Sequence, residues 1–156
     1  MTESPPRPKN FFTRRSINKL NKQVYNIYTT GNTSGEWKGV IVDQQGQTFL
    51  LNGVETNTNY TDIQFYIRTQ LSSVLEALEW ISDNLNEETE TEVKFYHNNI
   101  YIINILREWI YKWSKENFES CPHNDIMRKI NDILEKIKIV PVWVSTENQY
   151  EQLMNK

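Results

Sequence analysis

Few side chains in this sequence are of the types that nucleophilic or metal chemistry requires. Cys121 is the only cysteine, so it cannot form an internal disulfide, and a lone cysteine is more often an inert thiol than a nucleophile. His97 and His123 are the only histidines. Because structural zinc sites draw most of their four ligands from Cys and His, this supply is too small for one. We therefore expect no thiol nucleophile, no metal site of this kind and no cofactor.

Basic side chains gather near the N-terminus. Six basic residues and Glu3 give residues 1–23 a net charge of +5, which leaves −8 on the rest of a chain whose total is −3. Because that remainder repels phosphate on average, nucleic-acid binding would have to be local to this arm. Its candidate contacts are Arg7, Lys9, Arg14, Arg15, Lys19 and Lys22. A solvated tail is an equally good interpretation of the arm.

Length and composition indicate one folded domain. At 156 residues the chain is long enough to bury roughly 70% of its unfolded surface, and 38% of its residues are hydrophobic. No apolar run reaches the roughly 20 residues of a membrane span, and the N-terminus lacks the apolar stretch of a secretory signal. We expect a flexible arm over residues 1–23, a domain over residues 24–156, and an intracellular protein, cytoplasmic or nuclear, without membrane contact.

The local patterns predict three strands, then helices alternating with strands. Residues 24–29, 38–43 and 47–51 are rich in β-branched or aromatic side chains, and turn residues end each run, with Asn52-Gly53 after the third. Apolar residues at helical spacing predict a helix from Leu71 to about Asn86. A strand over residues 93–96 and a helix over residues 102–113 follow.

The last two predicted elements complete the sheet. Helical spacing recurs over residues 126–137, with Asn124 as a plausible N-cap. The apolar run over residues 139–144 is a strand, which Pro141 restricts to a sheet edge. The order β-β-β-α-β-α-α-β predicts an α/β fold with a mixed five-stranded sheet and helices on both faces.

Six short segments occur in an order that is found in one family of nucleases. The segments, each followed by the family pattern, are IYTTG at 27–31 (Y-T-D-G), GEWKGV at 35–40 (G-G-W-G), RTQL at 68–71 with EAL at 76–78 (R-A-E-L and E-A-L), YHNNIYIIN at 96–104 (Y-T-D-S-x-Y-V-I-N), WIYKW at 109–113 (W-I-x-x-W) and VWV at 142–144 (V-W-V). Over nearly all of residues 24–152 the chain resembles the ribonuclease H family.

The resemblance implies a two-metal site that this sequence lacks. Active members hold two divalent ions with four carboxylates, because hard anionic oxygens must balance the positive charge. The matching residues here are Thr30, Gln70 and Asn98, with Gln152 matching the fourth, and none of them is charged. The family's histidine loop, K-G-H-S-G, is also missing after the last strand. We therefore expect an inactive member without bound metal.

The surface that reads the nucleic-acid duplex differs as well. In the family, polar T-N-N or T-N-Q residues precede the helix Glu and contact the hybrid duplex, whereas Phe65, Tyr66 and Ile67 stand at those positions. An exposed apolar groove there would suggest a protein contact. The alternative is that a loop over residues 60–67 folds inward.

These observations favour a non-enzymatic protein-interaction or scaffold module, of viral or retroelement origin. One alternative is a non-cleaving RNA- or DNA-binding protein that uses the basic arm. The other is a residual metal-dependent ribonuclease with an unusual site.

Overall fold

Five strands form one mixed sheet in the computed structural model, which describes residues 22–86 and 88–146. The strand order is β3-β2-β1-β4-β5. β1 runs antiparallel to β2 and parallel to β4, while β2 and β3 are antiparallel and β4 and β5 are parallel. The strands are β1 (Gln23–Gly31), β2 (Glu36–Val42), β3 (Thr48–Val54), β4 (Thr91–His97) and β5 (Val142–Ser145). The predicted sheet is confirmed, and the last strand lies at an edge, directly after Pro141.

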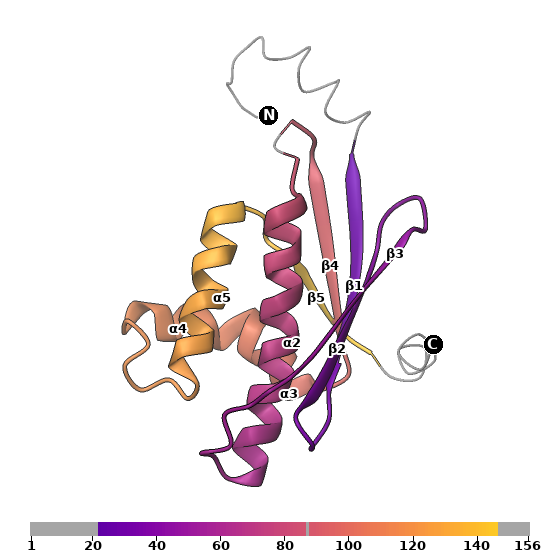
Figure 1. Ribbon diagram of the computed structural model, residues 1–156. Helices are drawn as coiled ribbons and strands as arrows, with labels where there is room; N and C mark the ends of the chain where they lie inside the picture. The colour runs from indigo at the N-terminus through magenta and orange to yellow at the C-terminus, as the bar shows by residue number, and fades with distance from the viewer. Residues whose placement is uncertain (1–21, 87, 147–156) are drawn as a thin grey trace.

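Three helical segments connect or follow these strands. α2 (Asp62–Asn84) is the long helix after the β-meander, and α5 (Asn124–Ile137) packs against it (Figure 1). Between β4 and α5 one helical run comprises α3 (Ile100–Asn104), the π-helical turn η1 (Ile105–Trp109) and α4 (Ile110–Lys115). Within the described residues, no helix combines the length and apolar character that crossing a bilayer requires.

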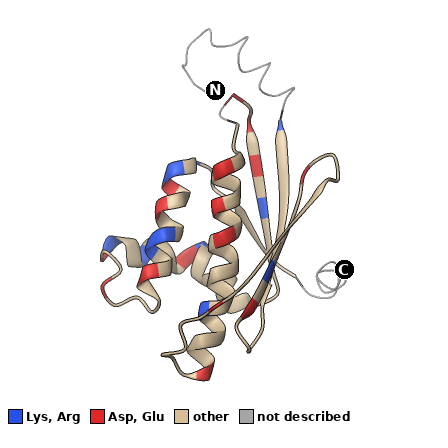
Figure 2. Ribbon diagram, in the orientation of Figure 1, with Lys and Arg blue, Asp and Glu red and all other residues tan. Residues whose placement is uncertain are grey.

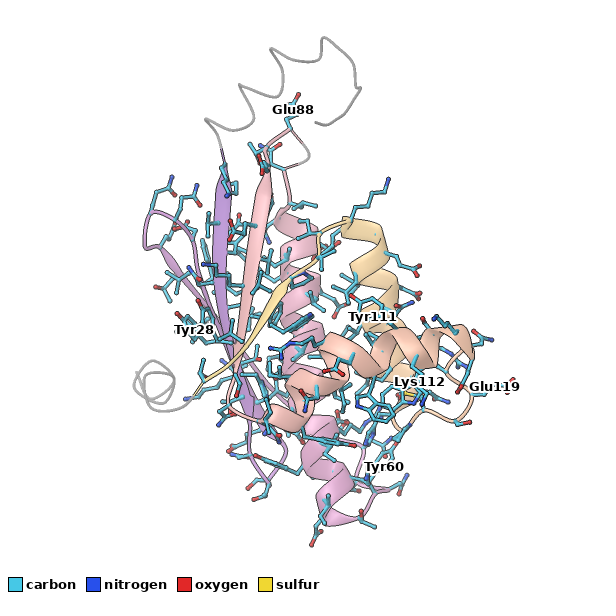
Figure 3. The ribbon with its side chains drawn as sticks, turned by 180° about the vertical axis from the view of Figure 1, so that it is seen from behind. Tyr28, Tyr60, Glu88, Tyr111, Lys112 and Glu119 are labelled. Atoms are coloured by element: carbon cyan, nitrogen blue, oxygen red, sulfur yellow. The ribbon has the colours of Figure 1, made fainter. Side chains whose placement is uncertain are left out.

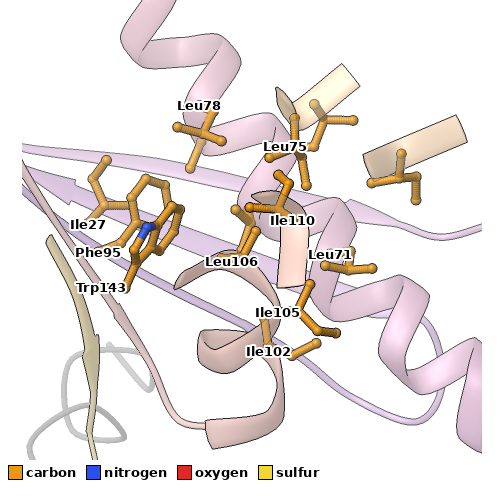
Figure 4. Close-up of a cluster of buried hydrophobic side chains, with 14 of the residues drawn as sticks. Ile27, Leu71, Leu75, Leu78, Phe95, Ile102, Ile105, Leu106, Ile110 and Trp143 are labelled. Carbon is orange, nitrogen blue, oxygen red and sulfur yellow. The ribbon is translucent and has the colours of Figure 1, made fainter. Parts of the chain in front are cut away.

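The main core lies between the sheet and these helices. Ile27 from the sheet, with Leu71 and Leu78 from α2, is among the most buried side chains (Figure 4), and these three and Ile41 are at most 1% exposed. Phe95 of β4 packs against Trp143 of β5 with ring centroids 4.8 Å apart. Because side chains alternate along a strand, this burial defines the face of the sheet that the helices cover.

The opposite face of the sheet carries no helix among the described residues. A row of side chains crosses this open face from edge to edge: Leu50, Val40, Tyr28, Tyr96 and Val144. Tyr28 and Tyr96 stack with centroids 4.7 Å apart, and Tyr28 lies on the side of the sheet away from the helices (Figure 3). In this part of the chain, the helices predicted for both faces lie on one face only.

The long helix begins earlier than the apolar spacing predicts. It starts at Asp62, and the side chain of Thr61 caps it by accepting a hydrogen bond from the Gln64 backbone N–H at 3.3 Å. Residues 62–67, which we expected in a loop, are therefore helical. The prediction failed because Arg68, Thr69 and Gln70 are buried polar residues that interrupt the apolar pattern.

Two local predictions are corrected by long-range packing. Asn52-Gly53 does not form a turn but continues β3 to Val54, and a Cβ at position 53 would overlap the indole of Trp37. Asn124 is the first residue of α5 and not its N-cap, a position that His123 takes with a left-handed φ of 56°. Both corrections depend on tertiary neighbours.

Candidate functional site

Thr30, Asn98 and Gln70 lie at the same end of the sheet. Thr29 and His97 are paired residues of the parallel strands β1 and β4, so Thr30 and Asn98 follow at the same end of neighbouring strands. Gln70 reaches this end from α2, where its Nε2 donates a hydrogen bond to the Gly31 carbonyl at 3.0 Å. Three of the four predicted positions thus lie at this end of the sheet, although Thr30, like Tyr28, alternates to the face away from α2. Gln152 lies outside the described residues.

Gln70 is sealed inside the molecule. Its side chain has no exposed surface, and its Oε1 has no hydrogen-bond partner among the described residues. The amide nitrogen is essential to this arrangement, because a carboxylate cannot donate a hydrogen bond to the Gly31 carbonyl. The amide of glutamine is therefore the form that this position accommodates.

A buried Thr–His pair links the ends of β1 and β4. Thr29 Oγ1 and His97 Nδ1 are 2.9 Å apart, and neither side chain is more than 1% exposed. Burial lowers the pKa of His97 to about 3, so the imidazole is neutral. The alternation of Val93, Phe95 and His97 along β4 indicates that His97 faces inward, but no pattern in the sequence indicates Thr29 as its partner.

These residues do not fit a pair of divalent ions. Thr30 is half-buried, Asn98 is exposed and Gln70 is enclosed, and all three are neutral. Neutral oxygens alone cannot balance four positive charges at close range. Across residues 22–86 and 88–146, no three His, Cys, Asp or Glu side chains are grouped as a metal site requires.

Arg68 anchors the part of α2 that carries Gln70. Its guanidinium makes two hydrogen bonds to the Asp125 carboxylate, at 3.0 and 2.6 Å, and an ion pair with Glu55 at 3.3 Å. It also donates to the Tyr60 hydroxyl at 3.2 Å, and the ring of Tyr60 lies at one end of α2 (Figure 3). Only 6% of Arg68 is exposed. This network fixes the first turns of α2 against α5 and the chain after β3.

His123 extends this network as a neutral acceptor and donor. Arg68 Nη1 lies 3.4 Å from His123 Nδ1, and His123 Nε2 lies 2.9 Å from Gln64 Oε1. Because a guanidinium can only donate, Nδ1 is the accepting nitrogen and Nε2 carries the proton. Burial, and then the charge of Arg68, lower the pKa of His123, which favours the same neutral form. The histidine is therefore a structural link.

The predicted apolar groove is partly filled by inward packing. Phe65, Tyr66 and Ile67 are half-buried in the first turns of α2. Phe65 packs against Gly35, where a Cβ would lie 2.7 Å from the phenyl Cζ, and Ile67 packs against the main core. For these two residues the structure agrees with inward folding, and a partner contact remains a prediction.

The basic arm lies almost wholly outside the described residues. Arg7, Lys9, Arg14, Arg15 and Lys19 belong to that undescribed part of the chain. Lys22 is described, and its Nζ forms an ion pair with Glu92 at 2.8 Å with 43% of the side chain exposed. On the described domain, acidic side chains recur along α2, whereas acidic and basic side chains alternate along α5 (Figure 2).

One known ribonuclease is similar to part of the sequence. No protein-family model matches the chain. Ribonuclease H of Campylobacter concisus (strain 13826) is 28% identical over 53 residues, which make up 34% of this chain and 37% of that protein. The match thus spans little more than a third of that relative.

Solved structures resemble most of the chain. LC9-RNase H1, a type 1 RNase H with the type 2 active-site motif, gives a TM-score of 0.58 at 14% identity over 86% of this chain and 70% of that one. LC11-RNase H1, isolated from compost, gives a TM-score of 0.56 at 15% identity over 86% of this chain and 91% of that one. The protease–reverse transcriptase of prototype foamy virus gives a TM-score of 0.55 at 13% identity over 85% of this chain and 19% of that one. The chain therefore has an RNase H-like α/β fold, whose chemistry depends on its own side chains.

Proposed function

We propose that this RNase H-like domain does not cleave nucleic acid and acts as a protein-interaction or scaffold module. Gln70 carries the proposal, because its amide is buried and committed to the Gly31 carbonyl at the position where the resemblance requires a metal-binding carboxylate. Thr30 and Asn98, which lie at the same end of the sheet, are neutral as well.

The charge of the domain favours a protein partner over a phosphate backbone. Beyond residue 23 the chain carries a net charge of −8, which opposes binding to a polyanion. The polar residues expected to read a duplex are replaced by Phe65, Tyr66 and Ile67. Aromatic side chains that remain half-buried are well suited to protein contacts.

The proposal predicts no metal-dependent cleavage. Calorimetric titration with Mg²⁺ should give no binding heat, and an RNA/DNA hybrid incubated with Mg²⁺ or Mn²⁺ should stay intact. A Thr30→Ala variant is the matched control, because it removes the hydroxyl from the candidate site. Cleavage by the unmodified chain that exceeds this control would overturn the proposal.

Titration with the same hybrid distinguishes the proposed protein-interaction module from the alternative, a non-cleaving nucleic-acid binder. That alternative requires binding that weakens steeply with salt and disappears when residues 1–21 are deleted, a change that spares β1. Absence of binding at low salt leaves protein contact as the favoured function.

Restoring the carboxylates tests whether the three positions share the geometry of a metal site. We expect Mg²⁺ to raise the unfolding temperature of the triple variant Thr30→Asp, Gln70→Glu, Asn98→Asp, because a bound cation would relieve the buried charge introduced at position 70, and to leave the unmodified chain unchanged. Binding to the folded state alone adds about 2.7 kcal/mol when Mg²⁺ is at about a hundredfold excess over Kd. The double variant Thr30→Asp, Asn98→Asp should respond less. A folded triple variant that ignores Mg²⁺ would contradict our placement of these positions.

A further inference from the structure

Within residues 22–86 and 88–146, the strand β3 forms an edge of the sheet that nothing in its own sequence protects. It runs for seven residues from Thr48 to Val54 in unbroken register with β2, without a bulge, a proline or a charged side chain. The opposite edge strand, β5, is four residues long and is preceded by Pro141. Natural proteins blunt free edges with short strands, proline, bulges or charges, because exposed backbone groups recruit another strand. Only β5 has such protection among the described residues.

Apolar side chains on β3 are unusually exposed. Leu50 is 69% exposed and Val54 is 60% exposed, and both point to the open face of the sheet together with Asn52. The row that starts at Leu50 continues across the open face through Val40 and Tyr28. Leu50 and Val54 therefore lie where a neighbouring strand would cover them.

We propose that β3 pairs with β3 of a second copy of this chain, antiparallel and about a two-fold axis through Asn52. In this register Leu50 lies opposite Val54 of the second copy, and symmetry repeats that apolar pair. Asn52 lies opposite its own counterpart, and each amide can donate and accept a hydrogen bond. All of these side chains are on the same face, because their positions differ by two.

The occupant is a second copy because β3 is complementary to itself. A two-fold interface places the same strand on both sides, so the Leu50–Val54 pair occurs twice and no like charges meet. Directly opposed cross-strand pairs add to the stabilisation that the backbone hydrogen bonds provide. The uncharged character of β3 can be followed in Figure 2. The inference goes beyond the proposed function, because the pairing uses backbone groups and side chains of β3 and none of Thr30, Gln70 and Asn98.

Sedimentation velocity over a wide concentration series tests this pairing. We expect a dimer that becomes more abundant with concentration. Leu50→Lys should weaken it about tenfold or more, because the introduced ammonium faces an apolar side chain across the strands. Val142→Lys is the matched control, since Val142 is 49% exposed on the other edge strand, and it should leave the dimer unchanged. Thermal unfolding confirms that each variant folds.

A charge pair tests the register. Val54→Glu alone should weaken the dimer, whereas Leu50→Lys combined with Val54→Glu in one chain should restore it through two opposite-charge pairs. A chain that stays monomeric at every concentration, or a dimer that ignores Leu50→Lys, overturns the proposal. If the double variant does not dimerise more strongly than Leu50→Lys alone, the proposed register is wrong. None of these outcomes alters the Mg²⁺ and cleavage assays, so the two proposals fail separately.

Discussion

Gln70→Glu is expected to lower the free energy of unfolding at neutral pH by about 3 kcal/mol or more, the scale of an uncompensated buried charge. The substitution removes the hydrogen bond to the Gly31 carbonyl and places a carboxylate oxygen against that carbonyl in a site without exposed surface. The imidazole of His97 is itself buried and neutral, so it offers no compensating charge. Urea unfolding of the variant and the unmodified chain measures the difference.

The loss of unfolding free energy caused by Gln70→Glu should become smaller as the pH falls. Burial raises the pKa of the introduced carboxyl in the folded state above its unfolded value of about 4.3. Between these two pKa values the folded state binds more protons than the unfolded state. The stability of the variant relative to the unmodified chain therefore rises as pH falls through the folded pKa. A protonated carboxyl can again donate to the Gly31 carbonyl.

A neutral control separates charge from the lost hydrogen bond. Gln70→Met keeps a side chain of similar length but removes the hydrogen bond and leaves the Gly31 carbonyl unpaired. We expect this change to lower the free energy of unfolding by about 1 kcal/mol. Its difference from the unmodified chain should not change with pH. If Gln70→Glu behaves like Gln70→Met across the pH series, the enclosed environment inferred for this position is incorrect.

The sequence predicted those features of the fold that local patterns determine. Alternation and helical spacing predicted the order of strands and helices along the chain and a mixed five-stranded sheet, and the resemblance singled out Thr30, Gln70 and Asn98, which lie at one end of that sheet. What the sequence did not predict is how buried polar groups are paired. His97 is 68 positions from Thr29, and Arg68 is 57 positions from Asp125, so no local window contains both partners.

Tertiary packing also overrode local turn preference. Asn-Gly is a strong turn signal because both residues tolerate positive φ. In β3 the same dipeptide is extended, because Gly53 leaves the space that the Trp37 indole occupies. The start of α2 was missed for a related reason, since Arg68 and Gln70 are buried through polar contacts and not through apolar spacing.

Arg68→Met is expected to lower the free energy of unfolding by about 3–5 kcal/mol, the usual result of removing one partner from a buried ion pair. Glu55, whose side chain is only 11% exposed, would lose its cation, and Asp125 would lose both guanidinium hydrogen bonds. Asp125→Asn should cost less, because the Asp125 side chain is 56% exposed and stays hydrated. Urea unfolding of both variants measures this order.

The acid limb of the stability curve provides a second readout for Arg68. The guanidinium lowers the pKa of Asp125 from 3.8 to about 2, so the interaction stabilises the fold above the unfolded pKa and is lost as pH falls toward the folded value. Arg68→Met should remove this part of the acid dependence. Arg68→Lys keeps the charge but not the bidentate geometry. Its acid dependence is expected to lie between that of the unmodified chain and that of Arg68→Met. If Arg68→Met unfolds with the acid dependence of the unmodified chain, the Asp125 contact does not stabilise α2 against α5, and the positioning of Gln70 must depend on the core alone.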